Sequence, residues 1–170
     1  SYDEKSLYVA FVCRDSHPEG IIARETVRDS KYAVHSFDNE IEDNVEFQID
    51  PFLSRNFSEI SRFSVNAIGT RSQRIGGGRS GKVEWKGDWE AAVHRDETGW
   101  SAEMRIPWEI LSYPSGSKTV NMGIQFSRFQ TRTQIQSLWS NTGPQLTTQD
   151  MGTLKSVEVP QKLFKRTLSL

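Results

Sequence analysis

The sequence predicts an all-β protein, folded as a single antiparallel β-sandwich of jelly-roll-like form with one or two short helical turns. Three observations lead to this fold class. Short segments alternate apolar and polar residues with the period of a half-buried strand. Clusters of glycine, proline, asparagine and aspartate separate these segments, as in all-β sandwiches. The 170 residues of the chain suffice for one domain with a sizeable core.

Three strands are expected in the first half of the chain. Residues 7–14, "LYVAFVCR", are apolar on both faces, which is typical of a central strand covered on both sides. Residues 45–50 and 62–69 alternate cleanly, so each should turn one apolar face to the core. Their inward side chains are Val45, Phe47, Ile49, Phe63, Val65 and Ala67.

The second half of the chain contains further strand patterns. Residues 89–95 precede "DETG" and should form a hairpin with residues 100–106. Residues 120–129 alternate from Val120 to Phe126, with the apolar positions facing inward. Weaker patterns at 135–140 and 152–159 complete the set of expected strands.

Helix is expected only as short turns, at residues 51–62 and 107–113, each of which begins with a proline. The sandwich should span residues 1–157. Residues 158–170 mix charges with a proline and are expected to be a linker or a last strand toward a larger protein. The start of the chain, which has neither a methionine nor a signal peptide, indicates an excised piece of such a protein.

Composition excludes several classes of function. The formal net charge of -1 removes the electrostatic basis for general nucleic-acid binding. No apolar run is long enough to cross a bilayer. Cys13 is the only cysteine, which rules out an internal disulfide, and its apolar surroundings indicate a buried, inert thiol. The three histidines show no zinc spacing. No cofactor is predicted; calcium held by loop oxygens stays open, with no ligands identifiable.

A glycine-rich stretch, "RIGGGRSGKVEW", resembles two phosphate-binding motifs. Gly76, Gly81 and Lys82 match the spacing of a phosphate-binding loop, but Val83 stands where that loop needs serine or threonine. Gly76, Gly78 and Gly81 match the second motif, G-x-G-x-x-G. Both motifs also need a helix to begin at the loop, and "VEWKGDW" does not favour one. A loop between strands is therefore the preferred interpretation.

The outward positions of several expected strands are polar and hydrogen-bonding. If these strands are neighbours, the side chains form a polar platform of the kind that binds sugars; an ordinary solvated sheet face is the alternative. A glycosidase pair of Glu46 and Glu103 is disfavoured, because Arg105 beside Glu103 would favour the ionised form of a group that must act as an acid. The platform residues are Glu46, Gln48, Ser64, Asn66, Glu103, Arg105, Gln125 and Ser127.

The five tryptophans divide into two groups. Trp100 falls on an inward strand position and is expected in the core. Trp85, Trp89, Trp108 and Trp139 lie near strand ends or turns, where an exposed indole could stack on a sugar ring. Packing at the edge of the core is the alternative for each of them.

Four landmarks, taken in order, resemble the family 9 carbohydrate-binding modules, within a wider group of DOMON-like sandwiches. They are "LYVAFVCRDS", "DNVEFQIDPF" with "FSVNAIG", "GWSAEMRIPWEIL", and "GIQFSRF" with "LWS" and "DMGTL". The sequence is most similar to N-terminal modules of large bacterial proteins that continue into an outer-membrane barrel. The resemblance implies a β-sandwich that binds sugar without catalysis, in a secreted setting, and a start that lacks the opening strands of the family.

The resemblance also implies where a sugar would bind. Characterised binders of the family clamp a terminal sugar between two tryptophans, whose positions here hold Glu40 and Gln145. The glutamate that assists them is retained as Glu46, whereas the expected arginine and glutamine fall at Ser64 and Ser127. The loss of both aromatic rings should weaken that mode of binding strongly.

The predicted function is therefore non-catalytic binding of an oligo- or polysaccharide by a module on the secreted, periplasmic or cell-surface side of a bacterial envelope. Its partners would be the carbohydrate and the rest of the parent polypeptide, with an outer-membrane barrel as the expected continuation. The alternative is a docking domain that kept the sandwich and lost the sugar site; haem binding, which relatives in the wider group show, is a weaker third hypothesis. The predicted platform centres on Glu46, with Glu103, Arg105, Gln125 and Arg128 around it and Trp139 as a stacking surface.

Overall fold

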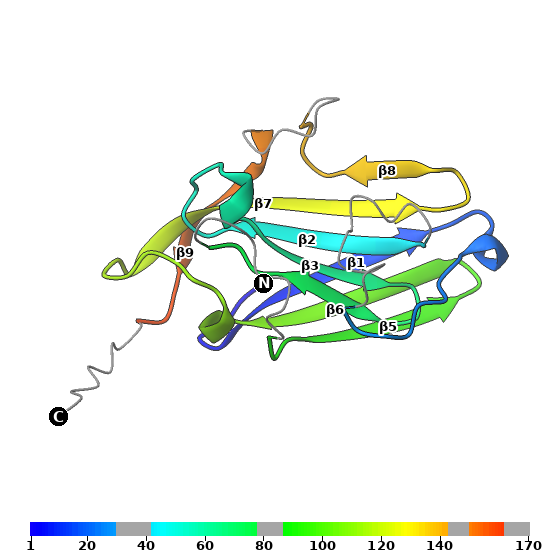
Figure 1. Cartoon of the computed structure of the whole chain (residues 1–170), viewed down its shortest axis with the longest axis horizontal. Coiled ribbons are helices and arrows are strands. Elements are labelled where there is room, and N and C mark those ends of the chain that lie inside the picture. The colour runs from blue at the N-terminus through cyan, green and yellow to red at the C-terminus, as the bar shows by residue number, and fades with distance from the viewer. Residues whose placement is uncertain (30–41, 78–86, 143–149, 162–170) are drawn as a thin grey trace.

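A computed structural model shows a sandwich of two antiparallel β-sheets (Figure 1). It describes residues 1–29, 42–77, 87–142 and 150–161. One sheet has three strands in the order β1-β6-β5, and the other has the order β4-β3-β2-β7-β8, with β9 also paired to β7. The predicted all-β sandwich is confirmed.

The three-stranded sheet consists of β1 (Ser6–Arg14), β6 (Gly99–Pro107) and β5 (Glu90–Asp96). The hairpin predicted between β5 and β6 is confirmed. Its turn is fixed by Asp96, whose carboxylate accepts the backbone N–H of Thr98 at 2.7 Å.

The six-stranded sheet is built around β7, whose two edges carry different neighbours. Strand β2 lies along one edge, while β8 and β9 share the other. Every strand predicted for this sheet is present, and β4 is an addition, because its sequence "RSQR" has no apolar alternation. The strands are β2 (Asn44–Asp50), β3 (Ser61–Asn66), β4 (Arg71–Arg74), β7 (Thr119–Gln130), β8 (Ile135–Leu138) and β9 (Gly152–Glu158).

The described residues contain three complete 3₁₀ turns, and Asp150 also has 3₁₀ conformation. The turns η2 (Phe57–Glu59) and η3 (Trp108–Ile110) fall inside the two segments predicted to contain them. The turn η1 (Pro18–Gly20) was not predicted. No helix in the described ranges has the length and apolar character that a bilayer span requires.

The core lies between the inner faces of the two sheets and contains the inward residues that alternation predicted. Trp100 is buried there, as expected. Trp89 and Trp108 are also fully buried, which selects packing over sugar stacking for both indoles. The best-buried large side chains include Phe47, Ile49, Phe63, Met104, Ile106 and Met122.

One prediction about β1 is wrong. The strand is not central and covered on both sides, but forms an edge of the three-stranded sheet. Its outward residue Val12 has 76% of its surface exposed, and Tyr8 has 38%. An apolar run identifies a strand with apolar faces but cannot tell whether neighbouring strands are present to cover them.

Several predictions fall on segments outside the described residues. They concern the glycine-rich loop at Gly81 and Lys82, the indole of Trp85, and the clamp positions Glu40 and Gln145. Residues 162–170, most of the expected linker, are also outside. Across the ranges that are described, no three histidine, cysteine, aspartate or glutamate side chains come together as metal ligands.

Candidate functional site

Two rows of polar side chains cross the outer face of the six-stranded sheet. The antiparallel register places residues directly opposite one another on β4, β3, β2 and β7, so each row runs across four strands. All of these residues except Arg74 are buried. We call them the polar rows: Ser72, Ser64, Glu46 and Ser127 form the first, and Arg74, Arg62, Gln48 and Gln125 form the second.

Glu46 is the centre of the polar rows and is only 2% exposed. Gln48 donates its amide N–H to Oε1 of Glu46 at 2.7 Å, and the Ser64 hydroxyl donates to Oε2 at 2.9 Å. Both carboxylate oxygens therefore accept a hydrogen bond, which a buried carboxylate requires.

Arg62 adds a buried guanidinium to the second row. Burial lowers the pKa of Arg62 to about 10, because desolvation penalises the charged form, while the nearby Glu46 carboxylate acts in the opposite direction. The guanidinium lies 4.2 Å from the ring centroid of Phe57 in the turn η2. Glu46 thus supplies a charge opposite to that of Arg62 on this face, while the neighbouring Arg74 carries the same charge as Arg62.

Gln125 lies opposite Gln48 and joins the face to the chain that follows β8. Its amide N–H donates to the Ser140 carbonyl at 3.0 Å and to the Ser140 hydroxyl at 2.8 Å. The Ser140 N–H in turn donates to Oε1 of Gln125 at 2.9 Å. These reciprocal bonds fix the orientation of the amide.

The polar rows thus offer one carboxylate, two amides, hydroxyls and two guanidinium groups on one side of a rigid sheet. These groups match the donors and acceptors of sugar hydroxyls, since carboxylate and guanidinium groups can each engage two of them in planar geometry. In this structure Glu46, Gln48 and Ser64 already hydrogen-bond to one another, and Gln125 hydrogen-bonds to Ser140.

The structure does not bring Glu103 and Arg105 to this face, which corrects the predicted single platform. Both lie on β6, in the other sheet of the sandwich. Alternation reports on which side of its own strand a residue lies, but not which sheet the strand joins. Glu46 and Glu103 consequently occupy the outer faces of opposite sheets and cannot flank one glycosidic bond.

Arg105 forms its ion pair with a glutamate other than Glu103, the neighbour that its spacing in the sequence suggested. Its Nε donates to Oε2 of Glu90, on the neighbouring strand β5, at 3.0 Å. Tyr8 and Glu103 border the same shallow depression of about 740 Å³ on the outer face of the three-stranded sheet. This face is exposed and charge-paired, and it lies apart from the polar rows.

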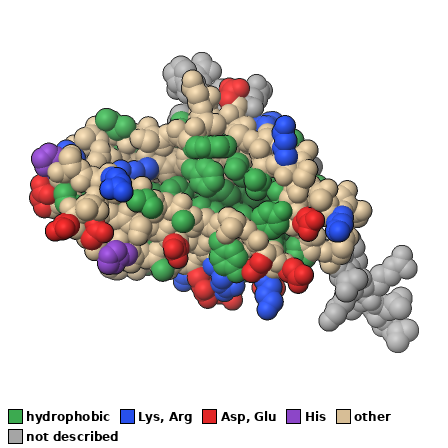
Figure 2. All heavy atoms as spheres, turned by 180° about the vertical axis from the view of Figure 1, so that it is seen from behind, with side chains coloured by type: hydrophobic (Ala, Val, Ile, Leu, Met, Phe, Trp, Pro, Cys, Tyr) green, Lys and Arg blue, Asp and Glu red, His purple; other side chains and the backbone are tan. Residues whose placement is uncertain are grey.

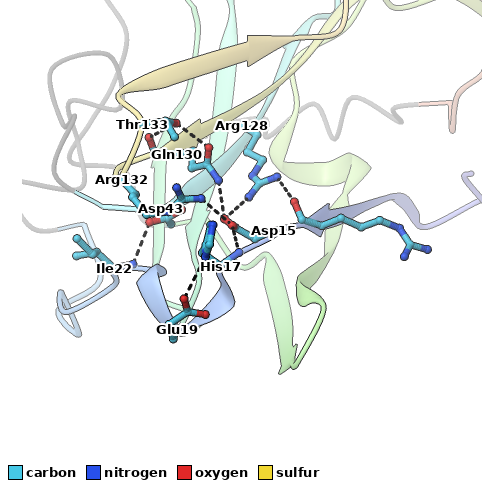
Figure 3. A network of polar contacts seen from close by, with 10 residues as sticks. Asp15, His17, Glu19, Ile22, Asp43, Arg128, Gln130, Arg132 and Thr133 are labelled. Carbon is cyan, nitrogen blue, oxygen red and sulfur yellow. Dashed lines mark hydrogen bonds and ion pairs between the residues drawn. The ribbon is translucent and has the colours of Figure 1, made fainter.

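Arg128 likewise lies away from Glu46, although both strands belong to one sheet. The register pairs Arg128 with the inward residue Val45, so its side chain leaves the opposite face of β7. Figure 3 shows it in a polar cluster around Asp15. Its guanidinium donates to the Arg14 carbonyl at 2.8 Å and to Asp15 at 3.3 Å.

The Asp15 cluster holds the end of β1 against the β7–β8 turn. Gln130 donates to the Asp15 carboxylate at 2.5 Å, Arg132 at 3.0 Å and the His17 backbone N–H at 2.9 Å. Burial alone would raise the pKa of Asp15, but these hydrogen bonds and the Arg132 charge outweigh it and hold the pKa below its ordinary value. The cluster was not predicted, although Arg128, Gln130 and Arg132 alternate in "SRFQTR" and so point one way.

Trp139 is exposed, at 60% of its surface, but it too lies on the far side of the sheet from Glu46. Its ring meets the inward residue Phe126 edge to face, with centroids 5.5 Å apart. A predicted stacking surface beside Glu46 is therefore not formed. Of the six predicted site residues, Glu46 and Gln125 share a face, together with Gln48, Ser64 and Ser127.

Comparison with known proteins finds relatives by structure and none by sequence. No protein-family profile matches the chain, and no curated protein matches it. A family 9 carbohydrate-binding module from Caldicellulosiruptor kristjanssonii in complex with cellotriose superposes with a TM-score of 0.52 at 16% identity, over 99% of this chain and 76% of that one. The module from the same organism in complex with glucose gives 0.53 and 16%, over 98% and 76%. The chain therefore has the fold of the family 9 carbohydrate-binding modules.

Proposed function

We propose that this chain is a non-catalytic carbohydrate-binding module whose sugar face is the polar rows. The observation that carries the proposal is the placement of Glu46, Gln48 and Gln125 on one outer sheet face of a fold shared with modules solved in complex with cellotriose and with glucose. Carboxylate and amide groups in this arrangement are suited to the hydroxyls of a glucose-type sugar.

Glu46 is the residue that should matter most. A carboxylate accepts two hydrogen bonds from adjacent hydroxyls, and it does so more strongly than a neutral acceptor. Since Gln48 and Ser64 occupy its oxygens in this structure, sugar binding exchanges those internal bonds for bonds to the ligand. The net gain per bond is then modest. We expect weak affinity, because the Phe57 ring beside the polar rows is already contacted by the Arg62 and Arg74 guanidinium groups.

The test is a glycan-array screen followed by calorimetry with cellotriose and glucose. The parent is compared with Glu46→Gln, which keeps the shape of the side chain and removes its charge. Glu103→Gln is the matched control, because it makes the same change on the other sheet. Circular dichroism and thermal unfolding establish that each variant is folded.

Binding that is lost in Glu46→Gln and retained in Glu103→Gln supports the proposal and its face. Loss only in Glu103→Gln keeps the sugar function and moves it to the depression beside Tyr8 and Arg105. If the folded parent binds no glycan on the array, the proposal is overturned.

One observation favours a second candidate, a docking domain that kept the sandwich and lost the sugar site. Glu46 is 2% exposed and hydrogen-bonded within the protein, as expected of a structural carboxylate. Under this alternative, Glu46→Gln changes the thermal stability and no sugar binds. The two candidates thus differ in the calorimetric result for the folded parent.

A secreted or envelope setting, with an outer-membrane barrel as continuation, belongs to the same proposal. The support is the resemblance of the sequence to modules of that kind. The chain has a single cysteine and so no internal disulfide, and cysteine pairing therefore gives no information about its compartment. Fractionation of the native host with an antibody to this chain tests it, and recovery from the cytoplasmic fraction would contradict it.

A further inference from the structure

Arg74 is a charged member of the polar rows whose hydrogen-bonding groups are not used by the protein. It is the last residue of β4, is half-buried, and lies directly opposite Arg62 on β3. In the described part of the chain its guanidinium forms no hydrogen bond or ion pair, and its contact is with the Phe57 ring, whose centroid lies 4.7 Å away. Such a group is a set of positioned N–H donors that a ligand can engage.

Arg62 places a second positive charge beside Arg74. It is only 5% exposed, and its guanidinium lies 4.2 Å from the centroid of the same Phe57 ring. The two guanidinium carbons can therefore lie no farther apart than the sum of their distances to this ring. Burial is the main cause of the lowered pKa of Arg62, and the like charge of Arg74 adds to it.

The polar rows consequently carry more positive than negative charge. Glu46 is their one carboxylate, against two guanidinium groups. Arginines elsewhere on the molecule are paired: Arg105 lies 3.0 Å from Glu90, and Arg132 lies 3.0 Å from Asp15. Figure 2 shows acidic and basic side chains gathered along the lower edge of the face behind that of Figure 1. An anion at the polar rows would supply the charge that these other arginines find within the protein.

Asp50, the next outward carboxylate along β2, does not supply this charge. Its oxygens accept the Arg55 backbone N–H at 2.7 Å and the Ser54 hydroxyl at 3.3 Å. It forms no ion pair with Arg74, which stays without an anionic partner among the described residues.

We propose that the polar rows bind an acidic sugar, a glycan with a uronic acid residue whose carboxylate pairs with Arg74. The inference rests on the proposed function and adds to it the class of sugar. A planar guanidinium matches a carboxylate through two parallel N–H···O bonds. Strand β3 separates Arg74 from Gln48, so their backbones lie about 10 Å apart. A disaccharide spans this distance better than one ring, with its other hydroxyls at Glu46 and Gln125.

The test compares two disaccharides by calorimetry. One is cellobiose, and the other has glucuronic acid in place of its non-reducing glucose, so the pair differs by a carboxylate in place of a hydroxymethyl group. The parent is compared with Arg74→Gln, which removes the charge, and with Arg74→Lys, which keeps the charge and removes the planar fork. Arg95→Gln is the matched control, because it removes the charge of an exposed arginine on β5 in the other sheet. Thermal unfolding establishes that each variant is folded.

The parent should bind the acidic disaccharide about tenfold or more tightly than cellobiose at low salt, since the added bonds join two charged groups. Arg74→Gln should abolish this preference and leave the affinity for cellobiose within about twofold of the parent. Arg74→Lys should keep part of the preference, and Arg95→Gln should keep all of it. The preference should shrink in about 0.5 M salt.

The outcomes separate this inference from the proposed function. Equal binding of the two sugars by the parent overturns the inference and leaves the sugar function standing, whereas binding of neither sugar overturns both. A preference that survives in Arg74→Gln, or that is lost equally in Arg95→Gln, also overturns the pairing with Arg74. If Arg74→Gln is unfolded, Arg74→Lys decides the case, because a preference unchanged from the parent contradicts a bidentate pair at this position.

Discussion

The indole N–H of Trp89 donates to Oε1 of Gln73 across 2.6 Å in the interior of the sandwich. Gln73 is the residue that the missed strand β4 turns toward the core, opposite Phe63. The same oxygen accepts the Arg28 guanidinium at 2.8 Å, and the Asp29 carboxylate accepts the Gln73 backbone N–H at 3.1 Å. A polar side chain thus connects a fully buried tryptophan to the edge of the six-stranded sheet.

Gln73→Leu should destabilise the protein by about 1–3 kcal/mol, because the Trp89 N–H would lose its acceptor inside the core. Urea unfolding monitored by tryptophan fluorescence measures the change. Gln136→Leu, the same substitution on β8, where the side chain is half-buried, is the control and should stay within about 0.5 kcal/mol of the parent. Equal effects of the two substitutions would show that the Trp89 bond contributes nothing.

Asp15 should make the stability of the protein depend on acid pH. The pKa of Asp15 is lower in the folded protein than its ordinary value. A lowered pKa means that the folded state favours the ionised form, so its contribution is complete above about pH 5 and is lost as pH falls through about 3.9 toward the folded value. Thermal unfolding between pH 3 and 7 measures this loss.

Asp15→Asn should cost about 2–3 kcal/mol at neutral pH, since Arg128 and Arg132 would then face a neutral amide. The variant should also lose part of the decline in Tm below pH 5. Glu97→Gln, in the exposed turn of the β5–β6 hairpin, is the control and should follow the parent at every pH. A decline as steep in Asp15→Asn as in the parent would assign the acid sensitivity to other carboxylates.

The strands of this fold follow from alternation, and their bounds come within a few residues of prediction. Strand β4 could not be predicted from alternation, because its inward position is filled by the polar residue Gln73, whose partner Trp89 is distant in sequence. The edge position of β1 was missed for a similar reason: the pattern in "LYVAFVCR" describes the strand's own faces, while its neighbours depend on the whole sheet.

The candidate site shows the same limit more sharply. Polar alternation correctly identified a set of outward-facing polar residues, and the six-stranded sheet places them on one face. They are Glu46, Gln48, Ser64, Gln125 and Ser127. Nothing in the spacing of Glu103 could reveal that β6 belongs to the other sheet. Side chains alternate between the two faces of a strand, so Arg128 must point away from the face that Ser127 and Gln125 share on β7. Strict alternation along this strand therefore already separates Arg128 from Glu46.

Cys13 should react slowly with thiol reagents while the protein is folded. It is buried on the inner side of β1, and desolvation raises its pKa to about 11 despite the nearby charge of Arg128. Alkylation by iodoacetamide at pH 8, followed by mass spectrometry, should be about a hundredfold slower in buffer than in urea. Comparable rates in the two solutions would contradict the burial of this thiol.

The ion pair of Arg105 and Glu90 should contribute little to stability. The atoms lie 3.0 Å apart, but the side chains are 38% and 62% exposed, so water screens the attraction. A double-mutant cycle of Arg105→Met and Glu90→Gln should give a coupling energy of about 0–1 kcal/mol that falls further in 1 M salt. A larger, salt-insensitive coupling would indicate a more enclosed site at the depression beside Tyr8.

Gly152 should be needed for the position of Trp139. A Cβ atom at Gly152 would overlap the indole at Cζ3 and Cη2, so the ring lies directly against the backbone of β9. Gly152→Ala should therefore displace the indole from Phe126 and lower Tm, with the change visible in the NMR resonances of both rings. Gly116→Ala is a control for the glycine itself: Gly116 has a φ of 89° and open space around it, so it should lower Tm through backbone strain while leaving the Trp139 resonances in place. Unchanged Trp139 signals in Gly152→Ala would mean that the indole does not lie against the backbone of β9.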